Sequence, residues 1–142
     1  MATGHNIPMG LRAAYLSMHR QTEACFAKSG VTAQQFVLLA LLTEADGITQ
    51  QQLVQRAFSD PNTIRAMLVL LEKQGLVARE QHPNDGRARH ITITRKGRKT
   101  YERLLEDSEP LRKRMLAMFN SEEIKMLAMF LSRISEAMVQ CE

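Results

Sequence analysis

The stretch DPNTIRAMLVLLEKQGLVAREQHPNDGRARHITIT, residues 60–94, begins with the signals of a helix. Asp60 is a typical N-cap, and Pro61 suits the first helical position because its missing N–H is not needed there. Gly75 is a typical left-handed terminator. Between them, apolar residues at i, i+4 and i+7 share one face, which we expect to pack inward: Ile64, Leu68 and Leu71. The polar residues of the first turns are left facing outward.

After Gly75 the apolar spacing changes from helical to alternating, which predicts two strands. We expect these strands near residues 76–80 and 90–94, with Ile91 and Ile93 on one face of the second strand. The connection between them is centred on the turn dipeptide Asp85-Gly86, so the two strands form a β-hairpin.

The rest of the chain is predicted to be helical. A helical stripe runs from about residue 11 and ends at residues 28–30. TAQQ (32–35) and TQQQ (49–52) are capping boxes that start a central, almost wholly apolar helix and a short helix. After the hairpin, Thr94 should cap a long helix that Pro110 kinks or interrupts, and Asn120-Ser121 should begin the last helix.

These elements predict a mainly α fold of the α+β class. We expect about six helices and a two-stranded hairpin in one domain over residues 1–142, a usual domain length. A short helix, a turn, a longer helix and then a two-stranded wing form a winged helix-turn-helix.

The positive charge of the chain lies in its centre. Residues 60–99 carry nine basic and four acidic side chains, a balance of +5, whereas the whole chain carries only +4. A localised basic surface is expected of a protein that binds the phosphate backbone of DNA. Aromatic residues make up only 5% and Trp is absent, so stacking on single-stranded nucleic acid is not expected.

Other classes of site find little support in the sequence. Two cysteines far apart and four scattered histidines have no metal-ligand spacing, so we expect no metal site and no cofactor. No nucleophile–base set, paired carboxylates or phosphate loop indicates an enzyme. The absence of an apolar signal or membrane-spanning run favours a cytoplasmic, nucleoid-associated protein with reduced thiols.

The first turns of helix 61–74 are the predicted recognition site. In a helix-turn-helix such positions enter the major groove, where Arg can bond guanine bidentately, Asn can pair with adenine and Thr can meet a base edge or a phosphate. The residues concerned are Pro61, Asn62, Thr63, Arg65 and Ala66. The alternative is a capped surface helix with ordinary polar residues.

The hairpin supplies a second predicted contact. Arg87 and Arg89 are suited to the minor groove, and Asp85 can orient Arg87. A solvated loop is the simpler alternative. Phosphate contacts are expected from four residues beside the wing and the short helix: Thr49, Gln50, Arg95 and Lys96.

Three segments together resemble the MarR family of bacterial transcriptional regulators. They are ITQQQL (48–53), DPNTIRAMLVLLEKQGLV (60–77) and NDGRARHITITRKG (84–97), and the resemblance covers nearly all of the chain. It implies a DNA-binding lobe over residues 32–99, with the terminal segments 7–30 and 100–142 interlocking two copies into a homodimer. Each copy would read half of a near-palindromic double-stranded site. The common mode is repression, relieved by a small, often aromatic or phenolic effector.

The resemblance also assigns individual residues. Asp85 and Arg87 match the wing-tip pair that places an arginine in the minor groove, whereas Arg89 is better read as a phosphate contact. Ala66 stands where the family often has Arg, and Val69-Leu70 stands where Asp-Arg is frequent. These departures leave open which base positions are read.

Sensor functions are predicted only weakly. Tyr15, Met18 and His19 are candidates to line an effector cavity, although ordinary packing or surface roles explain them as well. Cys25 raises the alternative of a thiol-based redox regulator, against a plain packing role. A further alternative is a winged helix that contacts proteins, which would not need the basic central segment.

Overall fold

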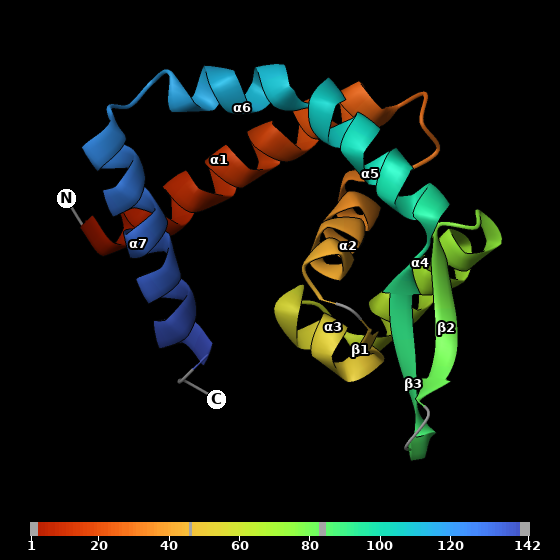
Figure 1. Ribbon diagram of the computed structural model, residues 1–142. Coiled ribbons are helices and arrows are strands. Elements are labelled where there is room, and N and C mark those ends of the chain that lie inside the picture. The colour runs from red at the N-terminus through yellow and green to blue at the C-terminus, as the bar shows by residue number, and fades with distance from the viewer. Residues whose placement is uncertain (1–2, 46, 83–84, 140–142) are drawn as a thin grey trace. The chain divides into compact units, whose positions relative to one another are not determined.

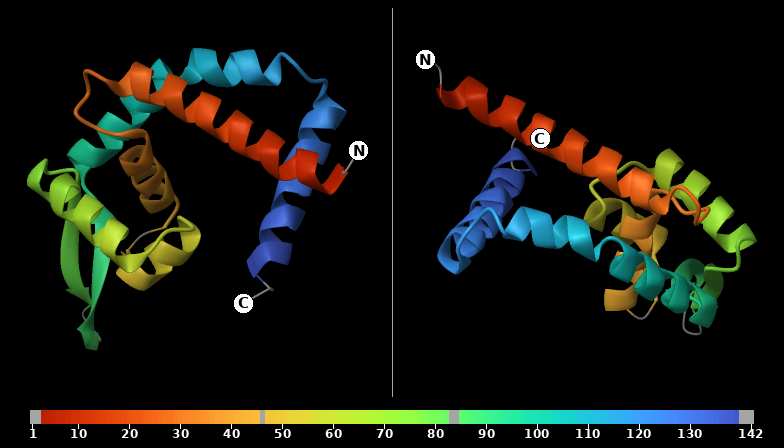
Figure 2. Two further views of the ribbon diagram at one scale, coloured as in Figure 1. Left: turned by 180° about the vertical axis from the view of Figure 1, so that it is seen from behind. Right: turned by 90° about the horizontal axis from the view of Figure 1, so that it is seen from above.

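The computed structural model describes residues 3–45, 47–82 and 85–139, with the strand residues among 82–89 described by their backbone alone. The chain divides into two compact units, Met1–Ser108 and Glu109–Glu142. The first unit contains five helices and a sheet among its described residues (Figures 1 and 2). In chain order its elements are α1 (Thr3–Phe26), α2 (Ala33–Glu44), β1 (Ile48–Thr49), α3 (Gln50–Arg56), α4 (Pro61–Lys73), β2 (Val77–His82), β3 (Asp85–Ile93) and α5 (Arg95–Asp107).

The two predicted capping boxes are confirmed, whereas the first helix begins at Thr3 instead of near residue 11. At α2, the Thr32 hydroxyl accepts from the Gln35 N–H and the Gln35 side chain accepts from the Thr32 N–H, which closes a capping box. Thr49 and Gln52 do the same at α3. These reciprocal bonds satisfy backbone donors that the first helical turn leaves without partners.

The core of the first unit is built around α2. Leu38, Leu39 and Leu42 are fully buried, as the apolar sequence of this helix predicts, although Val37 remains 46% exposed. The Phe36 ring lies 5.0 Å from that of Phe26 and is stacked 5.2 Å from that of Tyr101, so it ties α2 to α1 and α5. From α3 and α4 the core receives Leu53, Ile64, Leu68 and Leu71.

The sheet differs from the prediction in two respects. It has three antiparallel strands in the order β1-β3-β2, because Ile48 and Thr49 pair with Ile91 and His90. The hairpin strands are also longer than predicted, and Asp85-Gly86 lies within β3 instead of forming the turn. Backbone ladders need no apolar side chains, so pairing continues through a polar stretch where the alternation in the sequence ends. Figure 1 shows that the two-stranded ribbon formed by β2 and β3 extends beyond β1.

The second unit consists of α6 (Glu109–Leu116) and α7 (Ser121–Val139). The predicted interruption at Pro110 is confirmed, because α5 ends at Asp107 and α6 starts at Glu109. This break raises the count from about six helices to seven in the described part of the chain. Asn120 caps α7 through its side chain, which accepts from the Glu123 N–H at 2.8 Å.

Candidate nucleic-acid interface

Helix α4 separates an inner face from an outer one, as predicted. Ile64, Leu68 and Leu71 each have 0% exposed area. All five predicted recognition residues are exposed: Pro61, Asn62, Thr63, Arg65 and Ala66. Helix α3 packs against α4 beside the ribbon (Figure 2), and the Gln50 amide donates to the Pro61 carbonyl at 3.5 Å. The arrangement is a helix-turn-helix whose second helix is held by its inner face.

Asp60 fixes the N-terminus of α4. Its carboxylate accepts from the Thr63 hydroxyl at 2.7 Å and from the Thr63 backbone N–H at 2.9 Å. Both bonds favour the charged carboxylate and hold the pKa of Asp60 below its ordinary value. The Thr63 hydroxyl donates its proton to this cap, so toward an external partner it is an acceptor.

Replacing Asp60 by alanine should destabilise the protein in a pH-dependent manner. Because the folded-state pKa lies below the unfolded value of 3.8, the cap contributes fully above that value and its contribution is lost as the pH falls through the lowered pKa. Urea unfolding of both proteins between pH 7 and pH 3 measures this. The wild type should be the more stable at pH 7, and the difference in the free energy of unfolding should narrow as the pH falls below 3.8. The control is Asp60→Asn, whose neutral side chain can still cap α4. If wild type and Asp60→Ala differed equally in their free energy of unfolding at all pH values, the proposed role of the charge would be contradicted.

The turn before α4 contains a strained residue that the sequence did not reveal. Phe58 has φ +52° and is 74% exposed. Its N–H donates to the Gln55 carbonyl at 3.3 Å, and the next N–H, of Ser59, donates to the Val54 carbonyl at 3.1 Å. This is the Schellman pattern, in which the left-handed position is usually glycine. The same pattern ends α4, where Gly75 with φ +75° takes that position.

Phe58→Gly should therefore stabilise the protein, by up to about 1 kcal/mol. The substitution relieves the left-handed strain, and the exposed ring gives up little buried area. Gly75→Ala is the matched control, because it introduces strain at the same position of the same motif, and it should lower stability. Thermal unfolding at one protein concentration measures both changes. A fall in the melting temperature of Phe58→Gly would show that the ring itself contributes to folding.

The base of the wing is joined to the end of α4 by a cluster of hydrogen bonds. The Thr94 hydroxyl donates to the Gly75 carbonyl at 2.6 Å and accepts from the Gly97 N–H at 3.0 Å, which caps α5. The Lys96 ammonium donates to the Gln74 carbonyl at 3.0 Å, and the Thr94 N–H donates to the Leu76 carbonyl at 3.0 Å. We call this set of residues the wing joint.

An ion pair that the sequence did not suggest ties β2 to α4. Arg79 of β2 lies 3.2 Å from the Glu72 carboxylate, measured from Nε. The predicted wing residues Asp85, Arg87 and Arg89 lie in β3, but their side chains are outside the described part of the structure. Their proposed contacts stay predictions.

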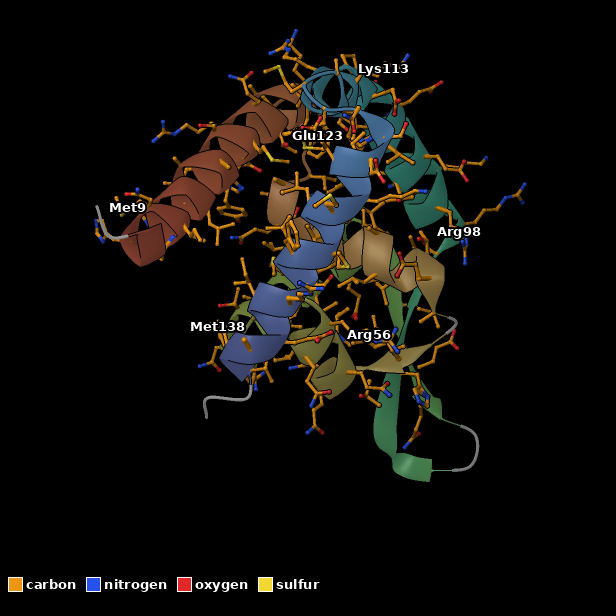
Figure 3. All side chains as sticks on the ribbon, turned by 90° about the vertical axis from the view of Figure 1, so that its left-hand side faces the viewer. Met9, Arg56, Arg98, Lys113, Glu123 and Met138 are labelled. Atoms are coloured by element: carbon orange, nitrogen blue, oxygen red, sulfur yellow. The ribbon has the colours of Figure 1, made fainter. Side chains whose placement is uncertain are left out.

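The predicted phosphate contacts are distributed around α3 and the wing joint. Thr49 and Gln50 lie at the start of α3, partly buried, and Arg95 is exposed at the start of α5. Lys96 is also exposed, with its ammonium on the end of α4. Arg98, three residues after Arg95, is a further exposed cation on the outside of α5 (Figure 3).

The predicted sensor residues all lie on α1. The Tyr15 and His19 rings are stacked 5.7 Å apart, and Tyr15 and Met18 are more than half exposed. Cys25, in the last turn of α1, is an exposed free thiol. Over residues 3–45, 47–82 and 85–139, no three or more His, Cys, Asp or Glu side chains gather as a metal site would require. No helix in those ranges is long and apolar enough to cross a membrane.

Known proteins share this architecture. A family model described as MarR family matches residues 31–88. An uncharacterized HTH-type transcriptional regulator of Bacillus subtilis, YdgJ, is 33% identical over 112 residues, which cover 79% of this chain and 66% of the relative. The solved structure of the transcriptional repressor CouR bound to a 23-mer DNA duplex has a TM-score of 0.81 at 27% identity, covering 89% of both chains. NadR in complex with 4-hydroxyphenylacetate has a TM-score of 0.81 at 26% identity, covering 90% of this chain and 91% of NadR.

The helix-turn-helix, the wing and their joint define a winged-helix protein with an exposed recognition helix. With the matching family model and relatives, they place it among bacterial transcriptional regulators. The chain belongs to the MarR family.

Proposed function

We propose that this protein binds double-stranded DNA sequence-specifically. It would act at the nucleoid as a homodimeric repressor of a near-palindromic operator. The observation that carries the proposal is the outer face of α4. Asn62 and Arg65 are exposed there, while the inner face of the same helix is fully buried. A helix anchored in this way can enter a major groove without disturbing the core.

The DNA-binding lobe, residues 32–99, would divide the contacts between grooves and backbone. Arg65 suits guanine and Asn62 suits adenine in the major groove. Arg87, oriented by Asp85, would enter the minor groove, where narrow A·T-rich stretches attract arginine. Contacts to phosphates would fix the register and come from Thr49, Gln50, Arg89, Arg95 and Lys96.

The terminal helices support a homodimer. No residue in the described parts of α6 and α7 is buried, although α7 carries an apolar stripe. Several large apolar side chains of α7 are 38% or more exposed, among them Leu127, Phe130 and Leu131, and Met138 (Figure 3) is 63% exposed. An apolar surface of this kind marks an interaction site. Two copies related by a twofold axis would present two copies of α4 to a near-palindromic site.

A small aromatic or phenolic effector would relieve the repression. Support comes from the solved structure of NadR, which holds 4-hydroxyphenylacetate. In this chain Tyr15, Met18 and His19 offer an aromatic and thioether surface on α1. Addition of phenolic acids should release bound DNA and raise the melting temperature of the free protein, because a ligand stabilises the state that binds it.

The DNA-binding function predicts a measurable salt dependence. A duplex recovered by selection from a random pool should bind less tightly as salt rises, with a slope of roughly −0.9 for each neutralised phosphate. Arg87→Ala should weaken binding and flatten the slope by about two units, because one cation leaves each half-site of the homodimer's complex. Fluorescence anisotropy across a series of salt concentrations measures both values.

Arg114→Ala is the matched control, since it removes one exposed arginine from α6, outside the DNA-binding lobe. It should leave the slope unchanged. If Arg87→Ala keeps the wild-type affinity and slope, the minor-groove contact is wrong. If the wild type selects no sequence and binds duplexes without salt dependence, the proposed function itself fails.

A further inference from the structure

The outer face of α4 has an apolar centre. Val69 is 41% exposed and Leu70 is 50% exposed, and Ala66 is exposed beside them. Spacings of three and four residues make neighbours on a helix surface, so the three side chains form one patch. We call Ala66, Val69 and Leu70 the apolar patch of α4.

Polar residues surround this patch on the same helix. Asn62 precedes Ala66 by four residues, Arg65 precedes Val69 by four, and Lys73 follows Val69 by four. All three are exposed, so the patch lies between groups that suit base edges and phosphates. Arg65 and Lys73 match the negative charge of the DNA backbone, and the exposed Glu72 beside Lys73 is paired with Arg79.

The patch has no role in the fold as described. The three core residues of α4 lie on the opposite face, and they already anchor the helix. While Val69 and Leu70 are exposed to water, they do not gain the favourable free energy that burial in an apolar contact provides. An apolar contact at this position therefore has to come from the surface that the outer face of α4 meets.

We propose that the apolar patch of α4 reads the 5-methyl groups of thymine. This inference rests on the proposed function, which places this face in the major groove. The thymine methyl is the one apolar group among the base edges exposed there, and apolar side chains contact it. Ala66 and Val69 are separated by roughly 4.5 Å along the helix axis, and bases follow one another every 3.4 Å or so along a strand. The two side chains thus meet neighbouring base pairs, and each half-site contains thymines there.

The experiment removes the methyl and nothing else. The duplex recovered by selection is synthesised with thymidine and again with deoxyuridine at the thymine positions of both half-sites, and affinities are measured at one salt concentration. Each lost methyl contact should weaken binding roughly fourfold. One contact in each of two half-sites then lowers the affinity of the wild type by roughly fifteenfold. Placing deoxyuridine at one position at a time locates the contacts.

Two valine variants connect the effect to the patch. Val69→Ala should shrink the ratio between the thymidine and deoxyuridine affinities, since the side chain that meets the methyl is gone. Val37→Ala is the matched control, because Val37 is 46% exposed on α2, which is not one of the two helices of the helix-turn-helix. It should keep the wild-type ratio. Both valines are exposed, so both variants should fold.

Different outcomes would overturn methyl reading and the proposed DNA-binding function. If the wild type binds both duplexes equally and keeps its salt dependence, DNA binding stands and methyl reading is overturned. If Val69→Ala and Val37→Ala keep the same ratio, the methyl effect does not pass through the patch, which also overturns the inference. If neither duplex binds and the patch instead captures a protein, the proposed function fails with it.

Discussion

Replacing Gly97 by alanine should lower the stability by about 3 kcal/mol or more, because the added methyl has no space. A Cβ at this position would lie 2.1 Å from the Leu76 carbonyl oxygen and 2.8 Å from Cγ1 of Ile93. The first of these atoms belongs to the backbone of the wing joint, so it cannot rotate away. Such a loss is a large part of the stability of a typical domain. Urea unfolding at constant protein concentration measures it.

Gly10→Ala is the matched control for this prediction. Gly10 lies within α1, and a Cβ there would meet no other atom within 4 Å. Alanine should raise the stability by about 0.5–1 kcal/mol, the usual gain in a helix interior. If Gly97→Ala were as stable as the wild type, the close approach of Gly97 to the Leu76 carbonyl oxygen would be contradicted.

Arg65→Ala should produce the largest loss of DNA affinity among single changes in α4. An arginine that bonds guanine through two donors is worth about 1–3 kcal/mol, or roughly 5- to 150-fold in affinity. Its loss should also relax the base preference at one position of each half-site. Selection from a random pool, followed by affinity measurements on the recovered duplex, tests both effects.

Arg103→Ala is the control, since it removes the same charge from the exposed side of α5. It should change neither the selected motif nor, beyond a small electrostatic effect, the affinity. If the Arg65→Ala protein selects the wild-type motif, Arg65 contacts the backbone instead of a base, and Asn62 becomes the main candidate reader.

Helix boundaries were predictable because their signals are local. The capping boxes at Thr32 and Thr49, the cap at Asp60 and the terminator Gly75 act within a few residues, and each is confirmed. The inner face of α4 followed from its apolar spacing alone. These features depend on neighbours in the chain, which the sequence displays.

Features that depend on distant residues were not predictable in this way. Strand β1 exists because Ile48 meets Ile91, and the close approach of Gly97 to Leu76 joins segments about twenty residues apart. The left-handed conformation of Phe58 contradicts the preference of its own side chain. The apolar patch was visible only as the unusual dipeptide Val69-Leu70, and its place on the outer face became clear from exposure.

The wing joint has a consequence for how this protein can diversify. The Thr94 N–H bonds the Leu76 carbonyl, so the two ends of the ribbon are closed on each other at its base. Val77 and Ile91 are buried in the core near this base, so only the outer part of the ribbon can be exchanged or lengthened while the helices keep their places. We therefore expect substitutions in the outer part of the hairpin to change the proposed minor-groove contacts while leaving the packing of α4 intact.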